Sequence, residues 1–271
     1  MNLENLTVAK SAAFSAKINL HISVGRFTIR TISAPEELAE AFRLRFQVFQ
    51  VEKAGSEISN GVDHDEFDFL SDHLAIFETK TNQMIATCRL NCSLFSNRFY
   101  SEQEFNCASL LNLVGTKMEI GRVCVQREFR KGIIVMLLWR AIAEYMKKSE
   151  SRYLFGCGSV ETLNAKDAVI LYRYLEEEKK INLKLNITPT EKFRSVEFDR
   201  LLLEYQRPLQ STERQFAENL LPSLCRSYFD IGCFTPGAPA FDFDFKCIDF
   251  LTILDVNDLD RQVRRKMFGE S

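Results

Sequence analysis

The chain has 271 residues, of which 46% are hydrophobic and 27% are charged, and its formal net charge is −2. These values are ordinary for a globular protein in water, with one large domain or two small ones. The near-neutral charge excludes a protein that binds nucleic acid through its overall charge, so we expect no nucleic-acid partner.

Cysteine and histidine usage argues against a metal site. The eight cysteines form no CxxC pair and most lie within apolar runs, and there are three histidines. This pattern favours buried thiols in a reducing compartment over a disulfide framework or a zinc site. No signal peptide and no membrane-spanning run is evident. We therefore expect a cytoplasmic protein, with peripheral contact at the inner face of the cytoplasmic membrane as an option.

The N-terminal half predicts an arm, a strand, a helix and a hairpin. Residues 1–20 carry no clear pattern, whereas residues 21–32 alternate as a strand does. Residues 34–37 combine a proline with two acids, which is typical of a helix start. We expect a helix to about Gln50 and an acidic loop over 53–72. Hairpin strands over 73–78 and 84–92 should follow, joined by a turn at Thr81-Asn82.

The best-defined stretch runs from Lys117 to Tyr145 and predicts a strand, a basic turn and a helix. Free N–H groups at a helix start, together with the helix dipole, form an anion site. The turn from Gln126 to Gly132 adds positive charge, although basic turns are often merely solvated. The sequence therefore predicts a phosphate site, with Arg130, Lys131, Gly132 and Ile133 as ligands and Arg127 as a further candidate.

The C-terminal half is less regular. It predicts a strand over 152–160 and a helix over 163–177, and the charged stretch over 178–210 resists interpretation. A helix over 212–228, a strand over 248–256 and a charged tail follow. The order of the elements predicts the α/β class, with a mixed sheet and helices on both of its faces.

A hairpin followed by a strand, a basic glycine turn and a helix resembles the GNAT N-acyltransferase fold. The resemblance implies a GNAT-like mixed central β-sheet and one acyltransferase domain over 21–271, with 1–20 as an arm and a variable insert around 176–215. In that family the turn binds the pyrophosphate or the phosphopantetheine phosphate of the donor. Here the turn keeps one glycine, which favours an acyl carrier protein over acetyl-CoA.

Three segments resemble the branch of the family that depends on acyl carrier protein: RLRFQVFQVE (43–52), VDHDEFD (62–68) and MEIGRVCV (118–125). That branch contains ornithine N-acyltransferases, N-acyl amino acid synthases and acyl-homoserine lactone synthases. EFDFLSDHLAIFE, YLFGCGSV and FDFDFKCIDFLTILD are most similar to the ornithine enzymes. The resemblance implies transfer of a fatty or 3-hydroxy fatty acyl group to the α-amine of an amino acid, ornithine first. The implied substrate-binding residues are Arg45, Phe49, Asp65, Asp68 and Arg89.

Glu119 and Arg122 are the candidate catalytic residues. Amide formation from a thioester needs an uncharged amine, and a carboxylate within reach can take its proton. Glu119 is a lone acid on an apolar strand. A simple ion pair with Arg122 is the alternative, but side chains three apart leave opposite faces of a regular strand. The pair therefore predicts a β-bulge, which would also aim backbone N–H groups at the thioester oxygen.

Several alternatives stay open at this point. Asp65 and Asp68 are suited to recognising a cationic amino acid, or to a solvated loop or a helix cap. Arg45 and Arg89 would orient these carboxylates, bind the substrate carboxylate, or form ordinary ion pairs. We expect no permanently bound cofactor, acyl carrier protein as partner and donor, acyl-CoA as the alternative donor, and a small amino acid as acceptor. Rival functions are a homoserine lactone synthase, an acetyl-CoA-dependent transferase and a non-enzymatic domain that binds carrier protein or lipid.

Overall fold

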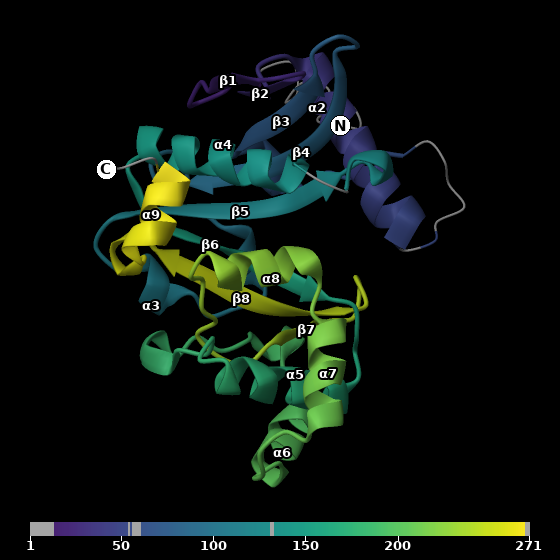
Figure 1. The fold of residues 1–271 in the computed structure, drawn as a ribbon, viewed down its shortest axis with the longest axis vertical. Helices are drawn as coiled ribbons and strands as arrows, with labels where there is room; N and C mark the ends of the chain where they lie inside the picture. Colours follow the sequence, from purple (N-terminus) through teal and green to yellow (C-terminus); the bar gives the residue numbers. More distant parts are fainter. Residues whose placement is uncertain (1–13, 54, 56–60, 131–132, 269–271) are drawn as a thin grey trace, which may run out of the picture. The chain divides into compact units, whose positions relative to one another are not determined.

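The computed structural model describes residues 14–53, 55, 61–130 and 133–268 (Figure 1). The described residues form two compact units. The first contains the chain up to Arg98, residues 116–152 and the C-terminal end from Arg264, and the second contains residues 99–115 and 153–263. The division into an arm over 1–20 and one domain over 21–271 stays a prediction. Lys131 and Gly132, two of the predicted phosphate ligands, lie outside the described residues.

Five strands of the first unit pair antiparallel in chain order: β1 (His21–Val24), β2 (Phe27–Thr31), β3 (Asp72–Glu78), β4 (Gln83–Cys92) and β5 (Thr116–Val125). The single strand predicted over 21–32 is wrong. Gly25, at φ 57°, turns the chain there and makes a hairpin of β1 and β2. The predicted hairpin turn at Thr81-Asn82 is confirmed, with Asn82 in the left-handed region at φ 53°.

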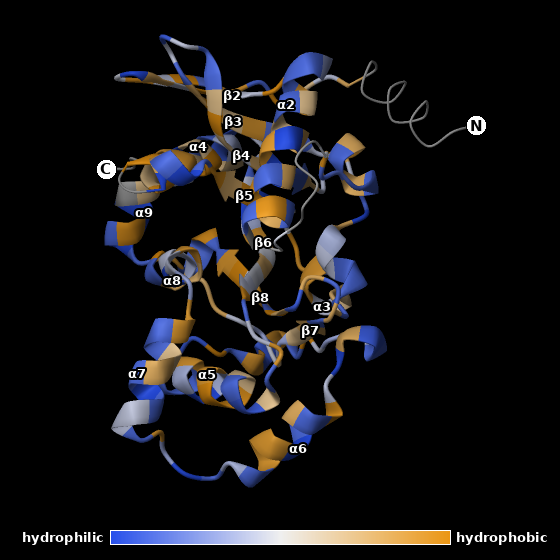
Figure 2. Cartoon of the chain, turned by 90° about the vertical axis from the view of Figure 1, so that its right-hand side faces the viewer, coloured by the Kyte–Doolittle hydropathy of each residue, from blue (hydrophilic) through white to orange (hydrophobic). Residues whose placement is uncertain are grey.

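Helices cover both faces of these strands. On one face, α2 (Pro35–Phe46) packs against β4 and β5, and its apolar side chains meet Ala75, Phe77, Met84 and Cys124. Figure 2 shows α2 as alternating hydrophobic and hydrophilic patches, as an amphipathic helix requires. On the other face, Tyr145 of α4 (Ile134–Lys148) donates its hydroxyl hydrogen to Asp72 at 2.7 Å. The predicted placement of helices on both faces holds for this unit.

Two segments beside α2 differ from expectation. The predicted helix to Gln50 is an α-helix only to Phe46 and continues as the π-helical segment η1 (Gln47–Lys53). The described part of the expected loose arm, residues 14–20, is docked. Phe14 is buried, and the backbone N–H groups of Lys17 and Ile18 donate to the Asp72 carboxylate at 2.8 Å each.

In the second unit, β6 (Ser151–Val160) and β7 (Ala240–Asp242) pair antiparallel with β8 (Cys247–Asp255). The helix predicted over 212–228 is two helices, α7 (Ser211–Leu220) and α8 (Ser223–Asp230), because Pro222 cannot continue the first. The remaining elements are η3 (Tyr100–Gln103), α3 (Ala108–Leu111), α5 (Ala165–Glu177), η5 (Leu183–Leu185), η6 (Glu191–Phe193), α6 (Val196–Glu204) and η7 (Val256–Asp258).

Buried apolar side chains anchor the stretch over 178–210, among them Ile187, Phe193 and Phe198. Phe198 of α6 is buried, and its ring centroid lies 5.8 Å from that of Tyr172 and 6.0 Å from that of Phe241. The charged tail that the sequence leaves unassigned contains α9 (Arg261–Phe268). Among the residues that the structure describes, no helix has the length and apolar character needed to cross a membrane.

Candidate active site

The acidic loop before β3 is ordered by its own aspartates. Asp65 precedes the 3-10 turn η2 (Glu66–Phe69), and its carboxylate accepts the N–H of Phe67 at 2.9 Å. In return, the Asp68 carboxylate accepts the N–H of Asp65 at 2.7 Å. This reciprocal cap fixes both carboxylates relative to the backbone, so the helix-cap option for these residues is observed.

Arg45 joins α2 to this loop. Its side chain is fully buried, its Nε donates to Asp63 at 2.9 Å, and its Nη1 donates to Asp68 at 2.6 Å. Asp63 is absent from the predicted site residues. The sequence carries the signal, because VDHDEFD contains four acids, but nothing in the spacing distinguishes Asp63 from Glu66, which pairs with the exposed Arg98 instead.

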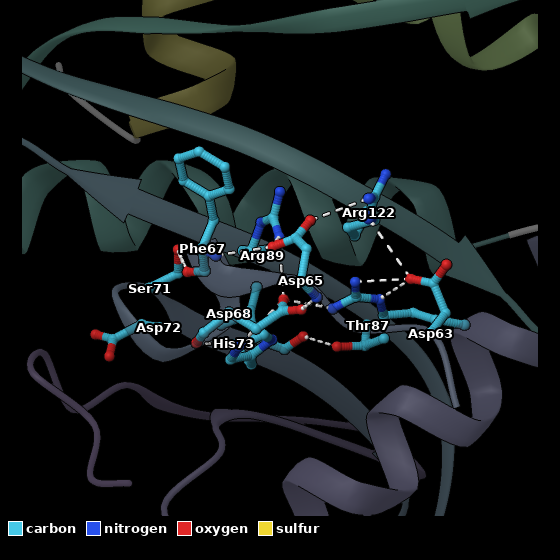
Figure 3. Close-up of polar contacts among 12 residues, drawn as sticks. Asp63, Asp65, Phe67, Asp68, Ser71, Asp72, His73, Thr87, Arg89 and Arg122 are labelled. Carbon is cyan, nitrogen blue, oxygen red and sulfur yellow. Dashed lines mark hydrogen bonds and ion pairs between the residues drawn. The ribbon is translucent and has the colours of Figure 1, made fainter. Parts of the chain in front are cut away.

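Two further arginines reach the same loop from the sheet (Figure 3). Arg89, on β4, donates through Nη1 to Asp65 at 2.5 Å and to Asp68 at 3.1 Å. Arg122, on β5, donates through Nη2 to Asp65 at 3.0 Å, and its Nε lies 3.5 Å from Asp63. Three arginines therefore meet three aspartates, and we call these six residues the Arg–Asp network.

The charges in the network account for the perturbed pKa values. Burial favours the neutral form of Asp68, but Arg45 and Arg89 outweigh burial and hold its pKa below the usual value. Burial lowers the pKa of His73 to about 4, so its imidazole is neutral near pH 7. Its Nε2 lies 3.0 Å from the backbone oxygen of Asp68 and therefore carries the proton, because a carbonyl oxygen only accepts.

The predicted bulge in β5 is confirmed. Thr87 of β4 pairs with Cys124 of β5, and Arg89 of β4 pairs with Gly121 of β5. Between these pairs β4 has one residue and β5 has two, Arg122 and Val123, which defines a β-bulge. Arg122 is one of these two and has a left-handed φ of 51°. The extra residue brings its side chain to the face that carries Arg89, which is also the face of Glu119.

Glu119 lies on that face next to the network. Its side chain is buried, and its cross-strand partner on β4 is Asn91. Burial of Arg89 lowers the pKa of its guanidinium, but the negative charges of Asp68 and Asp65 outweigh burial and raise it. The Glu119 carboxylate is close enough to Arg89 to add a smaller contribution in the same direction. A Cβ at Gly121 would make an ordinary contact with Arg89, 3.9 Å from its Nη2.

Phe49 is positioned by the π-helical segment that follows α2. It lies on η1, is half-buried, and packs against the apolar core beneath α2. Its spacing of four residues from Arg45 predicts a shared face of one α-helix. The change to π-helical geometry after Phe46 removes the regular spacing on which that prediction depends.

The predicted phosphate turn is described at its two ends. Arg130 is exposed, its Nη2 donates to Glu52 at 2.6 Å, and its Nε donates to the backbone oxygen of Val125 at 3.0 Å. Ile133 precedes α4, and no side chain caps this helix start. Arg127 lines an open cleft of about 650 Å³ beside α2. The cleft walls carry both charges, including Arg43, Glu40 and Glu128, so the cleft alone does not favour an anion.

One cluster of possible metal ligands appears within the described ranges, although the sequence predicts none. Glu104, Asp242 and Asp249 of the second unit are buried and place one carboxylate oxygen each within 4.8 Å of the others. Burial, followed by the charges of Asp249 and Asp242, raises the pKa of Glu104 to about 8. A proton on Glu104 near pH 7 therefore relieves the repulsion, and the cluster does not require a cation.

Comparison with known proteins shows which domain this part of the chain is similar to. Residues 44–140 match the model of the acetyltransferase (GNAT) domain, a span that contains the Arg–Asp network and the bulge. The chain is an acyltransferase with a GNAT-like fold. The predicted α/β GNAT-like fold and the predicted enzyme class are both confirmed.

Curated relatives of this acyltransferase bear one name. The L-ornithine N(alpha)-acyltransferase of Rhodobacter capsulatus is 27% identical over 255 residues, covering 88% of this chain and 93% of that protein. The protein of the same name from Agrobacterium fabrum is 25% identical over 273 residues, covering 94% and 90%. The one from Brucella abortus is 30% identical over 150 residues, covering 50% and 53%. The relatives are thus those that the sequence motifs indicate.

Proposed function

We propose that this acyltransferase moves a fatty or 3-hydroxy fatty acyl group from acyl carrier protein to the α-amine of ornithine, forming a lyso-ornithine lipid. The observation that carries the proposal is similarity to the ornithine enzyme of Rhodobacter capsulatus over 88% of this chain and 93% of that protein. Such coverage includes the second unit, which lies outside the GNAT-domain match.

The buried members of the network have a structural task in this proposal. Arg45 and Asp68 are buried and hydrogen-bonded to each other, so they hold η2 against the sheet. Asp65 and Arg122 keep side-chain exposures of 22% and 17%. These two are the members that can reach an amino acid, with Asp65 suited to its ammonium groups and Arg122 to its carboxylate.

Glu119 acts as the general base. Its carboxylate takes a proton from the α-ammonium group, and the resulting amine attacks the thioester carbon. A carbon–nitrogen bond forms and the carbon–sulfur bond breaks, and the released thiolate takes the second amine proton to leave as the thiol. Backbone N–H groups at the bulge in β5 stabilise the negative charge that develops on the thioester oxygen.

The uncapped start of α4, with Arg127 and Arg130 beside it, holds the phosphate of the phosphopantetheine arm. The exposed Lys147 and Lys148 in the last turn of the same helix favour an acidic carrier protein. Because the product carries a long acyl chain, it leaves most easily into a bilayer, which is the basis for proposing peripheral membrane contact.

The test uses purified protein, 3-hydroxypalmitoyl acyl carrier protein and ornithine, with the product identified by mass spectrometry. We expect N-acylornithine, and no product from ornithine whose α-amine is blocked. The same acyl group on CoA shows which donor is used. S-adenosylmethionine in place of ornithine tests lactone synthesis through release of methylthioadenosine. Absence of an N-acyl product with every amine would refute the proposal.

A further inference from the structure

Asn91, on β4, has an amide whose orientation is fixed by one hydrogen bond. The side chain is 1% exposed, and its Nδ2 donates to the backbone oxygen of Arg98 at 2.7 Å. Since a carbonyl oxygen only accepts, the NH₂ group must face Arg98. The amide oxygen Oδ1 is therefore also fixed, and it is buried without a donor among the residues described.

A buried amide oxygen without a donor is uncommon, because burial removes the water that would otherwise bind it. In folded proteins an ordered water or a bound ligand commonly supplies the missing N–H or O–H. The position of Asn91 in the sheet favours a binding site over a packing defect.

Asn91 is directly opposite Glu119 across β4 and β5. Side chains of such a pair leave the same face of the sheet, with Cβ atoms about 4.5–5.5 Å apart. Two oxygen acceptors therefore lie side by side, one an amide and one a carboxylate. Both side chains are under 5% exposed, so a donor group that reaches both oxygens has to be small, as an amine nitrogen is.

We propose that Asn91 Oδ1 and the Glu119 carboxylate together form the subsite for the α-amine of the acceptor. The inference rests on the proposed function. In the bound ammonium ion one N–H donates to Asn91 and a second donates to Glu119. Glu119 takes the second proton and leaves a neutral amine with a free lone pair. The remaining hydrogen bond to Asn91 still restricts the rotation of this amine. Asn91 is thus a substrate-binding and orienting residue, and it neither gains nor loses a proton.

The arrangement also favours primary amines as acceptors. The bound ammonium ion offers hydrogens to two acceptors and still needs room for the approaching thioester. A hydroxyl group has one hydrogen and serves one acceptor only. An acceptor with a hydroxyl in place of the α-amine should therefore be a poor ligand.

The experiment compares Asn91→Leu with Thr87→Val. Thr87 is a matched control, because it is equally buried on the same face of β4, and its hydroxyl donates to the backbone oxygen of Leu74. With acyl carrier protein as donor, kcat/KM for ornithine should fall at least tenfold in Asn91→Leu and less than threefold in Thr87→Val. The KM for the donor, and slow hydrolysis of the donor by water, should stay within twofold of wild type in both variants.

If Asn91→Leu does not fold, Asn91→Ser serves instead, since a smaller side chain avoids overpacking. Two results would overturn the assignment of Asn91 and leave the proposed function standing. In the first, kcat/KM for ornithine is the same in the Asn91 variant as in Thr87→Val. In the second, the Asn91 variant is impaired equally toward the donor and toward ornithine. Wild-type protein that acylates another primary amine but not ornithine changes the acceptor, and the comparison is then made with that amine. Wild-type protein that acylates no amine overturns the proposed function and this subsite with it.

Discussion

Replacing Glu104 by glutamine tests whether this buried carboxyl of the second unit makes stability depend on pH. The pKa of this carboxyl is raised from 4.5 to about 8, first by burial and then by Asp249 and Asp242. Below pH 4.5 the folded and unfolded states both hold the proton. Between 4.5 and 8 only the unfolded state releases it, so wild-type protein loses stability as the pH rises through this window.

The size of the effect follows from the displaced pKa. Each tenfold difference in proton affinity is worth about 1.36 kcal/mol, so the full cost above pH 8 is about 5 kcal/mol. Glutamine is neutral at every pH and avoids this cost. The free energy of unfolding of Glu104→Gln minus that of wild type should therefore grow by about 4 kcal/mol between about pH 5 and about pH 9.

Urea unfolding followed by circular dichroism measures this difference at each pH. Trp139, the single tryptophan, belongs to the first unit and would not report on the second. Taking the difference between the variants cancels the other titrating groups. Glu191→Gln, which replaces an exposed glutamate in the same unit, is the control. If the free energy of unfolding of Glu104→Gln minus that of wild type does not change with pH, the Glu104 carboxyl is not held in its protonated form by the folded protein.

Three further substitutions test the first unit. Glu119→Gln should lower single-turnover acyl transfer by about 10²–10⁴-fold with unchanged circular dichroism, and full activity would remove Glu119 from the chemistry. Asp68→Asn leaves Arg45 and Arg89 with one counter-charge fewer and should reduce the urea-derived free energy of unfolding by about 3 kcal/mol. Since the pKa of Asp68 is lowered, that loss should shrink as the pH falls below about 4, and a constant loss would contradict a role for its charge. Arg127→Ala removes one exposed charge and should raise the donor KM up to about fivefold at low salt, with less effect at high salt.

The elements that the sequence predicts best are those with strong local patterns. The strand, turn and helix over 117–145 follow from periodicity and one glycine. The hairpin follows from alternation around Thr81-Asn82. The bulge in β5 is predictable because Glu119 and Arg122 are polar residues three apart on an apolar strand, a spacing that regular alternation cannot place on one face.

The contacts that depend on distant segments are the ones that sequence reasoning misses. Asp63 lies in the same acidic loop as Asp65, and only the folded position of Arg45 distinguishes it from a solvated acid. Asn91 gains its meaning from its partner Glu119, and no local pattern marks it. Glu104 lies far along the chain from Asp242 and Asp249, so their meeting is a property of the fold alone.

The bulge in β5 makes this strand more sensitive to its length than to the identity of its residues. A substitution at Val123 leaves every neighbour on its present face. Loss of one residue between Gly121 and Cys124 would restore strict alternation, with Glu119 and Cys124 still on one face. The single residue left between Gly121 and Cys124 would point to the opposite face, so no arginine side chain of this strand would share the face of Glu119. The interval between the glutamate and the arginine is therefore structural information in its own right. In any chain that keeps a glutamate and an arginine three apart on this strand, the interval marks where the alternation must break.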